Sequence, residues 1–227
     1  MGSFFKLDVR GGDCMDGNVK WVNEKKILRA IEALENNNMN GYLVNGIEDV
    51  IEKIKLLVTE GSIVGCGGSM SLFEADIIDH LRTDRYKFLD RYEEGLSREE
   101  VVEIYRKSFS ADAYITSSNA ITEAGELYNV DGNGNRVAAM LYGPDKVIVI
   151  CGVNKIVLDV EEAIQRTRLI ASPANAKRLN RNTPCTKTGY CMDCKSPDRI
   201  CNEYTLIKRQ GSPDRIHVIF INEELGY

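Results

Sequence analysis

The run Val147-Ile-Val-Ile150 is the segment that most restricts the fold of this chain. Successive residues of a strand face opposite sides of a sheet, so a strand that is apolar throughout must be covered on both faces. A central strand of a mostly parallel sheet, with helices on either side, meets this requirement. The run therefore predicts an α/β fold.

Segments with helical and with extended patterning alternate along the chain. Apolar residues at three- and four-residue spacing predict helices that start near Asn23, Ile47, Leu72, Ser97 and Asp159. Ser71 with Glu74 and Ser97 with Glu100 match the capping-box pattern, and Asn23 and Asp159 are further caps. Short apolar runs predict strands at 41–44, 62–64, 86–89, 113–116 and 216–221.

The sequence Asp131-Gly-Asn-Gly134 supplies residues that tolerate positive φ. It predicts a hairpin between strands at 127–130 and 135–142. The whole pattern predicts a single Rossmann-like domain with a mostly parallel sheet, a β-hairpin insertion and a C-terminal four-cysteine loop.

Four of the seven cysteines, Cys185, Cys191, Cys194 and Cys201, have the spacing C-x5-C-x2-C-x6-C. The residues between them are polar or turn-forming, so packing alone does not explain how this loop, residues 185–201, is held. Four thiolates suit a tetrahedral zinc, an iron–sulfur cluster or a pair of disulfides. Because the loop has one C-x-x-C knuckle where structural zinc sites often have two, we expect a [4Fe–4S] cluster, with zinc as the alternative.

A glycine-rich turn follows the predicted strand 62–64 and precedes a predicted helix. In this arrangement, backbone N–H groups and a helix start can bind an anion, which makes Gly65, Gly67, Gly68, Ser69 and Ser71 candidate binding residues. The pattern matches neither the dinucleotide fingerprint nor the P-loop. Close packing of the strand on the helix is the competing interpretation.

The net charge of −5 argues against general nucleic-acid binding. No apolar run approaches the roughly 20 residues of a membrane span, and we expect no membrane partner. The odd cysteine count and the absence of an export signal predict a cytoplasmic protein. Residues 1–20 are expected to be a leader, either disordered or foreign to the native protein, with the domain spanning 21–227.

Four segments strongly resemble the LUD domain, the lactate utilization protein family: Thr116–Gly125, Asp131–Ala139, Tyr142–Pro144 and Val153–Lys155. The resemblance runs from about Trp21 to the C-terminus. It implies a fold similar to the sugar-phosphate isomerase (NagB/RpiA) and CoA-transferase superfamily. Better-known members belong to an iron–sulfur-containing system of several subunits that oxidises L-lactate to pyruvate, and this chain looks like a branch that carries its own cysteine motif.

Polar side chains at turns and strand ends are the remaining candidates. Glu123, Lys155 and Arg136 are predicted catalytic residues, with Glu123 a nucleophile by analogy with CoA transferases, and Arg136 or Lys155 holding a carboxylate or phosphate. The other predicted binding residues are Asn119, Thr122, Asp131, Asn135 and Asn154. Turn formation by Asp131 and Asn135, and an exposed helix start at Glu123, are the alternatives.

Three functions remain open. The chain is a cluster-dependent or redox enzyme acting on a small anionic metabolite, a transferase or isomerase with a structural zinc, or a non-catalytic subunit of a lactate-oxidising complex. Iron–sulfur redox proteins are expected partners, and the oligomeric state is open between a monomer and a homo-oligomer.

Overall fold

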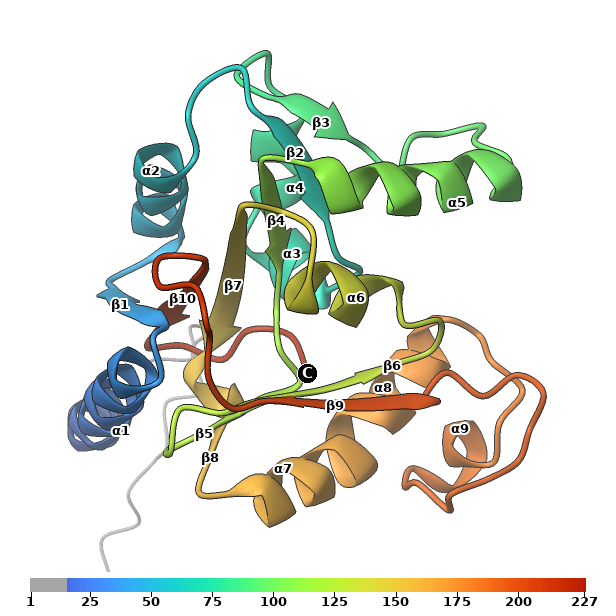
Figure 1. Ribbon diagram of the computed structural model, residues 1–227. Helices are drawn as coiled ribbons and strands as arrows, with labels where there is room; N and C mark the ends of the chain where they lie inside the picture. Colours follow the sequence, from blue (N-terminus) through green and yellow to red (C-terminus); the bar gives the residue numbers. More distant parts are fainter. Residues whose placement is uncertain (1–15) are drawn as a thin grey trace, which may run out of the picture.

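The computed structural model describes residues 16–227, and its main element is a parallel sheet of six strands in the order β1-β10-β7-β4-β2-β3 (Figure 1). The bounds of these strands, in chain order, are β1 Asn40–Val44, β2 Ile63–Cys66, β3 Lys87–Leu89, β4 Ala113–Thr116, β7 Lys146–Gly152 and β10 Ile216–Ile221. Every pairing is parallel. The prediction of an α/β fold with a mostly parallel sheet is confirmed.

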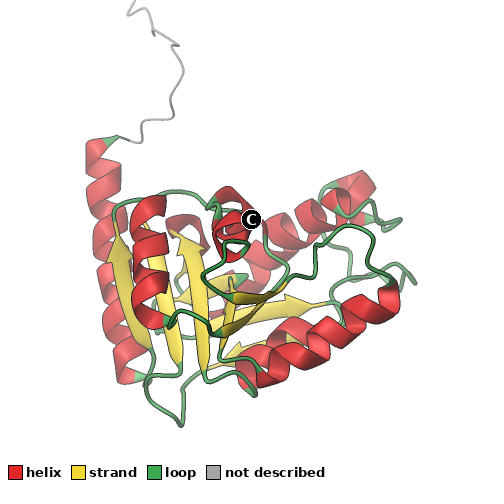
Figure 2. Ribbon diagram, turned by 90° about the horizontal axis from the view of Figure 1, so that it is seen from above, coloured by secondary structure: helices red, strands yellow, loops and turns green. Residues whose placement is uncertain are grey.

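Strand β7 is buried on both faces. Ile148 and Ile150 pack with α2, α3 and α4, whereas Val147, Val149 and Cys151 pack with α1 and α6. These helices are α1 Gly17–Asn36, α2 Ile47–Leu57, α3 Met70–Glu74, α4 Ile77–Leu81 and α6 Asn135–Leu141. Figure 2, seen from above, shows helices on both sides of the strands.

A second, four-stranded sheet has the order β8-β5-β6-β9. It consists of β5 Ala120–Thr122, β6 Leu127–Asp131, β8 Ile156–Val157 and β9 Glu203–Ile207. Helix α7 (Val160–Arg166) packs on it through Ala163. A π-helical turn, Thr167–Ala171, joins α7 to α8 (Ser172–Arg178), and the short α9 (Cys185–Thr188) opens the cysteine loop.

Of three predicted helix starts, two are confirmed by the structure and one is wrong. Ser97 and Glu100 form both hydrogen bonds of a capping box at α5 (Arg98–Lys107), and Asp159 caps α7, as predicted. The prediction that Asn23 caps the first helix is wrong, because Asp16 accepts the capping hydrogen bonds. Residues 17–20, assigned to the leader, therefore belong to α1, and the rest of that prediction, through residue 15, lies outside the described residues.

The segment predicted as one helix from residue 72 differs in two ways. It begins at Met70 and breaks into α3 and α4 at Asp76, which has φ +53°. The capping box predicted for Ser71 and Glu74 is wrong, because the Ser71 hydroxyl donates to Leu225 O (3.1 Å) and the Glu74 carboxylate accepts from Gly226 N (2.6 Å). Both side chains hold the segment after β10.

The prediction of the hairpin is wrong for its second strand. Residues 135–141 form helix α6, and the antiparallel hairpin joins β5 to β6. Gly134, with φ +68°, turns the chain, and the Asp131 carboxylate accepts from the backbone N–H of Arg136 (3.0 Å). Strand β6 is already paired on both sides, by β5 and β9, so it has no free edge for residues 135–142. Within residues 16–227, no helix is long and apolar enough to cross a membrane.

Candidate functional site

A small polar pocket lies where β2, β4 and β7 end. Its wall includes Gly68 and Ser69 after β2, and Ser117 to Asn119 after β4. Lys155 comes from the 3-10 turn after β7 (Val153–Lys155), and α8 closes the far side. The cavity volume is about 70 Å³, on the order of five water-sized positions, so a ligand enclosed there has only a few heavy atoms. The carboxyl ends of parallel strands are where ligands bind in α/β sheets.

Lys155 is the buried cation of this pocket. Only 2% of the residue is exposed, and its ammonium donates to the hydroxyls of Ser71 (2.7 Å) and Ser117 (2.9 Å). Burial is the main cause that lowers the pKa of Lys155 to about 8, and Arg166 and Arg136 act in the same direction. No carboxylate within residues 16–227 forms an ion pair with it. A buried ammonium without an anionic partner favours an anionic ligand.

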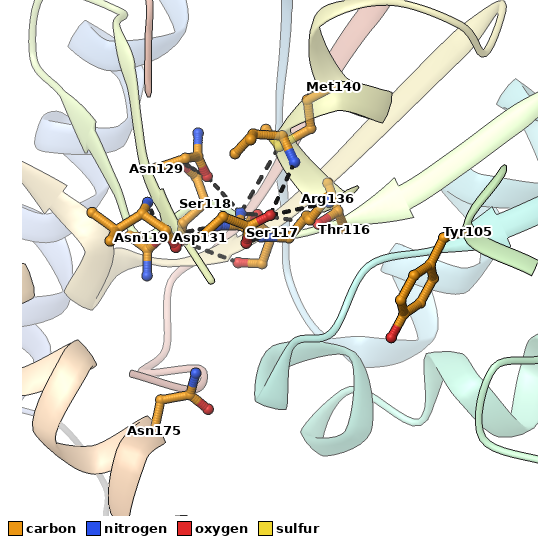
Figure 3. Close-up of polar contacts among 12 residues, drawn as sticks. Tyr105, Thr116, Ser117, Ser118, Asn119, Asn129, Asp131, Arg136, Met140 and Asn175 are labelled. Atoms are coloured by element: carbon orange, nitrogen blue, oxygen red, sulfur yellow. Dashed lines mark hydrogen bonds and ion pairs between the residues drawn. The ribbon is translucent and has the colours of Figure 1, made fainter. Parts of the chain in front are cut away.

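Arg136 is held by a complete set of hydrogen bonds (Figure 3). Its Nε donates to Asp131 (3.1 Å), Nη1 donates to Ser117 O and Asn129 Oδ1, and Nη2 donates to Asn119 Oδ1 and Val130 O. All five N–H groups of the guanidinium are therefore used inside the protein. Arg136 joins the loop after β4 to β6 and has no free N–H for a ligand.

Helix α8 adds two polar residues to the pocket. Arg178, an exposed residue, donates to Asn175 Oδ1 (2.8 and 3.2 Å), and among the described residues it forms no ion pair. In Figure 3, Asn175 lies on α8 across from the Asp131–Arg136 pair. The Asn119 amide uses its oxygen for Arg136 and Val130, and its N–H2 has no partner within residues 16–227. Arg178 and Asn119 thus offer free donors at the pocket.

The structure brings together six of the residues predicted from sequence: Gly68, Ser69, Asn119, Asp131, Arg136 and Lys155 line the pocket. Ser71 contacts the Lys155 ammonium, and Asn154 holds the segment after β10 by bonds to Gly226 O (2.9 Å) and Leu225 N (3.1 Å).

Gly65 and Gly67 serve close packing. A Cβ at Gly65 would lie 2.7 Å from Ser108 Oγ, and a Cβ at Gly67 would lie 2.5 Å from Thr116 Oγ1. Cys66, between them, is buried, and burial raises the pKa of its thiol to about 12. This environment leaves the Cys66 thiol, at the end of β2, protonated.

The other predicted residues do not line this pocket. Glu123 forms an ion pair with Arg29 of α1 (2.9 Å), and its side chain is 23% exposed. Thr122 accepts from Glu126 N (3.1 Å) in the β5–β6 turn. Asn135 opens α6 and lines a separate groove beside α5. Ser117, Asn175 and Arg178 received no role from sequence, because a serine in a loop and polar residues on an amphipathic helix carry no pattern that marks a ligand site.

The four loop cysteines line one small pocket of their own, and all four are free thiols. Asp193 N donates to Cys191 Sγ (3.4 Å), and Thr183 Oγ1 lies 3.2 Å from Cys185 Sγ. Burial is the main cause that raises the pKa of the Cys201 thiol, Arg199 opposes it, and Cys191 and Cys194 raise it further. Among the described residues, no group of three or more His, Cys, Asp or Glu is close enough to hold a single metal ion.

Arg199 ties the cysteine loop together. It donates to Cys194 O (2.6 Å) and Cys201 O (2.8 Å) and pairs with Asp193 (2.9 Å). Four thiols around one pocket, with a cation and N–H donors nearby, are a donor set that fits a thiolate-bound metal centre, because such donors stabilise the charge of the sulfurs.

Helix α8 separates the two pockets. Asn175 and Arg178 line the polar pocket, whereas Ser172 and Ala176 line the cysteine pocket. These residues lie on neighbouring faces of α8, and no residue lines both pockets.

Comparisons with known proteins agree with this architecture. A family model described as LUD domain matches residues 27–221. The crystal structure of a DUF162 family protein from Deinococcus radiodurans is similar, with a TM-score of 0.52 and 16% identity, and covers 88% of this chain and 98% of that chain. The crystal structures of eIF2B beta and eIF2B delta from Chaetomium thermophilum match less well, with TM-scores of 0.34 and 0.32 at 14% and 17% identity. They cover 51% and 64% of this chain and 44% and 55% of their own. No curated protein matches the sequence.

Proposed function

The chain belongs to the LUD domain family, and we propose that it binds a small organic anion in the polar pocket and an iron–sulfur cluster in the cysteine loop. In this proposal the protein takes part in lactate or related organic-acid metabolism. It acts there in a redox or cluster-dependent reaction, either as an enzyme or as a subunit of one.

The observation that carries the anion site is the Lys155 ammonium, which is buried without a carboxylate partner among the described residues. Arg178 and the Asn119 amide add free donors, and these groups suit a carboxylate or phosphate. The pocket volume of about 70 Å³ favours a small metabolite.

The donor set of four thiols supports the cluster. Cys185, Cys191, Cys194 and Cys201 would hold it, and a cluster supplies one-electron chemistry when bound. Helix α8 contributes residues to both pockets: Asn175 and Arg178 line the polar pocket, and Ser172 and Ala176 line the cysteine pocket. The free thiols agree with a reducing, cytoplasmic compartment.

Zinc is the second candidate for the cysteine loop, because four thiolates are a usual zinc donor set, but the four thiols as placed among the described residues are too far apart to hold one ion. Glu123, the nucleophile that a transferase would require, is paired with Arg29 and does not line the polar pocket. This placement favours the cluster proposal over the transferase.

Anaerobic purification followed by iron, sulfide and zinc analysis tests the cluster. We expect iron and sulfide with visible absorbance, both lost in Cys194→Ser. Cys66→Ala is the matched control, because Cys66 is a cysteine buried outside the loop. A colourless wild-type protein with stoichiometric zinc contradicts the iron–sulfur assignment.

Calorimetric titration with L-lactate, pyruvate and inorganic phosphate tests the anion site. We expect Arg178→Gln to weaken the binding of whichever anion the wild type takes by about tenfold, the usual effect of losing one charge-assisted hydrogen bond. Lys177→Gln is the control, because Lys177 is an exposed cation of the same helical turn that does not line the pocket. Equal weakening in both variants contradicts a specific site.

A further inference from the structure

We propose that Lys155 reacts as a nucleophile and forms an imine with a small anion that carries an aldehyde or ketone carbonyl. The inference rests on the proposed function of the polar pocket and names the chemical class of its ligand. It gives the buried lysine a covalent role in addition to its charge.

The environment of the Lys155 nitrogen suits a neutral amine. Among the described residues, Lys155 is the one lysine that is buried, and its direct partners are two hydroxyls. The Ser71 hydroxyl donates its hydrogen to Leu225 O, so it accepts from the lysine. The Ser117 hydroxyl has only long contacts elsewhere, to Ser118 O (3.4 Å) and Cys151 Sγ (3.7 Å), and its hydrogen is available to a neutral amine.

Some of the charged groups around Lys155 raise its pKa and others lower it. Arg166 and Arg136 oppose the ammonium form, and Cys151 and Glu74 favour it, but burial outweighs the other effects and lowers the pKa of Lys155 to about 8. The neutral fraction therefore rises as the pH passes through about 8, whereas an exposed lysine reaches the same fraction only near its usual pKa of 10.5. Lysines with this property serve as nucleophiles toward carbonyl compounds.

The pocket places the reacting group next to the anion donors. Lys155, Asn119 and Arg178 line the same cavity of about 70 Å³. A ligand that binds Arg178 and Asn119 through its charged group has only a few heavy atoms left. The polar lining that remains includes the Lys155 amine and the Ser117 hydroxyl, beside the Asp131–Arg136 ion pair and the Asn175 amide. A carbonyl is the group that an amine can bind covalently without a further reactant.

The step balances without an oxidant or reductant. The nitrogen lone pair of the neutral amine attacks the carbonyl carbon, and the C–N bond forms as the C=O π bond opens to a carbinolamine. Both hydrogens of the amine end on the former carbonyl oxygen, with the Ser117 hydroxyl positioned to relay a proton. The oxygen leaves as one molecule of water, and the C=N bond remains.

Reductive trapping tests the proposal on the full-length protein. The protein is incubated with glyoxylate or pyruvate and sodium cyanoborohydride, which delivers hydride to the C=N carbon. We expect one adduct per chain, with the mass of the probe plus two hydrogens less one water, located at Lys155 by peptide mass spectrometry. Labelling of Lys155 should rise as the pH passes through about 8, and its excess over the labelling of exposed lysines should shrink at higher pH as those lysines lose their protons.

Two lysine variants sharpen the test. Lys155→Arg keeps the charge but cannot form the imine, so the adduct should disappear. Lys146→Arg is the control, because Lys146 is a partly buried lysine that donates to Leu57 O (3.0 Å) outside the pocket. The location of the adduct in the wild-type protein decides the matter if Lys155→Arg does not fold.

The outcomes separate this proposal from the anion site itself. Binding of the probe without trapping at Lys155 overturns the imine and leaves the anion site intact. Labelling spread evenly over exposed lysines, unchanged in Lys155→Arg, also overturns it. Absence of both binding and trapping contradicts the anion site as well.

Discussion

The guanidinium of Arg136 connects the loop after β4, strand β6 and helix α6 through its five N–H groups. Its ion pair with Asp131 is largely buried, with side-chain exposures of 9% and 12%. Removing one member of a buried, hydrogen-bonded ion pair leaves the other charge without a partner. Arg136 is therefore a residue on which the geometry of the pocket depends, although it has no free donor for a ligand.

We expect Arg136→Met to lower the free energy of unfolding by about 3–5 kcal/mol, measured by denaturant titration. Arg106→Met is the control, because Arg106 pairs with Glu103 at 3.9 Å with both side chains more than half exposed, and such pairs contribute about 0–1 kcal/mol. A loss for Arg136→Met as small as that of the control would show that the network is not a stabilising one.

Among the elements, helix α5 shows how a local signal sets a helix start. Ser97 N and Ser97 Oγ both donate to the Glu100 carboxylate, and these bonds lower the pKa of Glu100. Because the pKa of Glu100 is lower in the folded state, its contribution to stability is present above the unfolded pKa and is lost as the pH falls through the folded value.

The corresponding prediction concerns pH. The difference in unfolding free energy between the wild type and Glu100→Gln should be largest near neutral pH and should shrink as the pH falls through the folded pKa of Glu100. Denaturant titrations at a series of pH values measure it. Glu99→Gln, an exposed carboxylate of the same first turn for which no capping bond forms, should show a weaker dependence, and an equal one would contradict the capping-box explanation.

The cysteine loop is an element held by polar contacts, and Arg199 supplies several of them. We expect Arg199→Met to retain less metal than the wild type after anaerobic dialysis against a chelator, because the backbone at Cys194 and Cys201 loses its donors. Arg209→Met is the control, because Arg209 is exposed and lies outside the loop. Equal retention in the two variants would show that the thiols alone hold the metal.

Across the molecule as a whole, the segment that follows β10 returns over the sheet to the polar pocket. Gly226 has φ +60°, and a Cβ there would lie 2.6 Å from Ser71 Oγ and 3.4 Å from Lys155 Nζ. Asn154 and Glu74 hold its backbone. Of the two ends of the described chain, only the C-terminal end contributes a residue to the polar pocket.

We expect Gly226→Ala to weaken binding in the polar pocket as well as the stability of the protein. Gly61→Ala is a matched control, because Gly61 has φ +82° and a Cβ added there would have no atom within 4 Å. Both variants should lose about 1 kcal/mol of stability from the backbone conformation, measured by denaturant titration. Only Gly226→Ala should reduce anion affinity by calorimetry, and unchanged affinity would show that the segment does not shape the pocket.

Local signals predicted much of the fold because their causes are local. The apolar run at β7, the capping box at Ser97 and the cap at Asp159 act within a few residues. The strand predicted at 135–142 is wrong because Asp131-Gly-Asn-Gly134 serves a hairpin turn and a strand-to-helix turn equally well. The partners of β6 decide between them, and they include β9, which is distant in sequence.

The α/β fold and the strand ends as the place of a polar site followed from local patterns in the sequence, and the cysteine spacing led to the prediction of a metal centre. Which strand-end residues meet depends on the packed chain: Lys155, Asn119 and Arg178 line one pocket, whereas Glu123 pairs with Arg29. The same packing sets α8 between that pocket and the cysteines. The physical reason is that hydrogen-bond patterns and apolar periodicity act along the chain, whereas burial and charge pairing depend on neighbours that are distant in sequence.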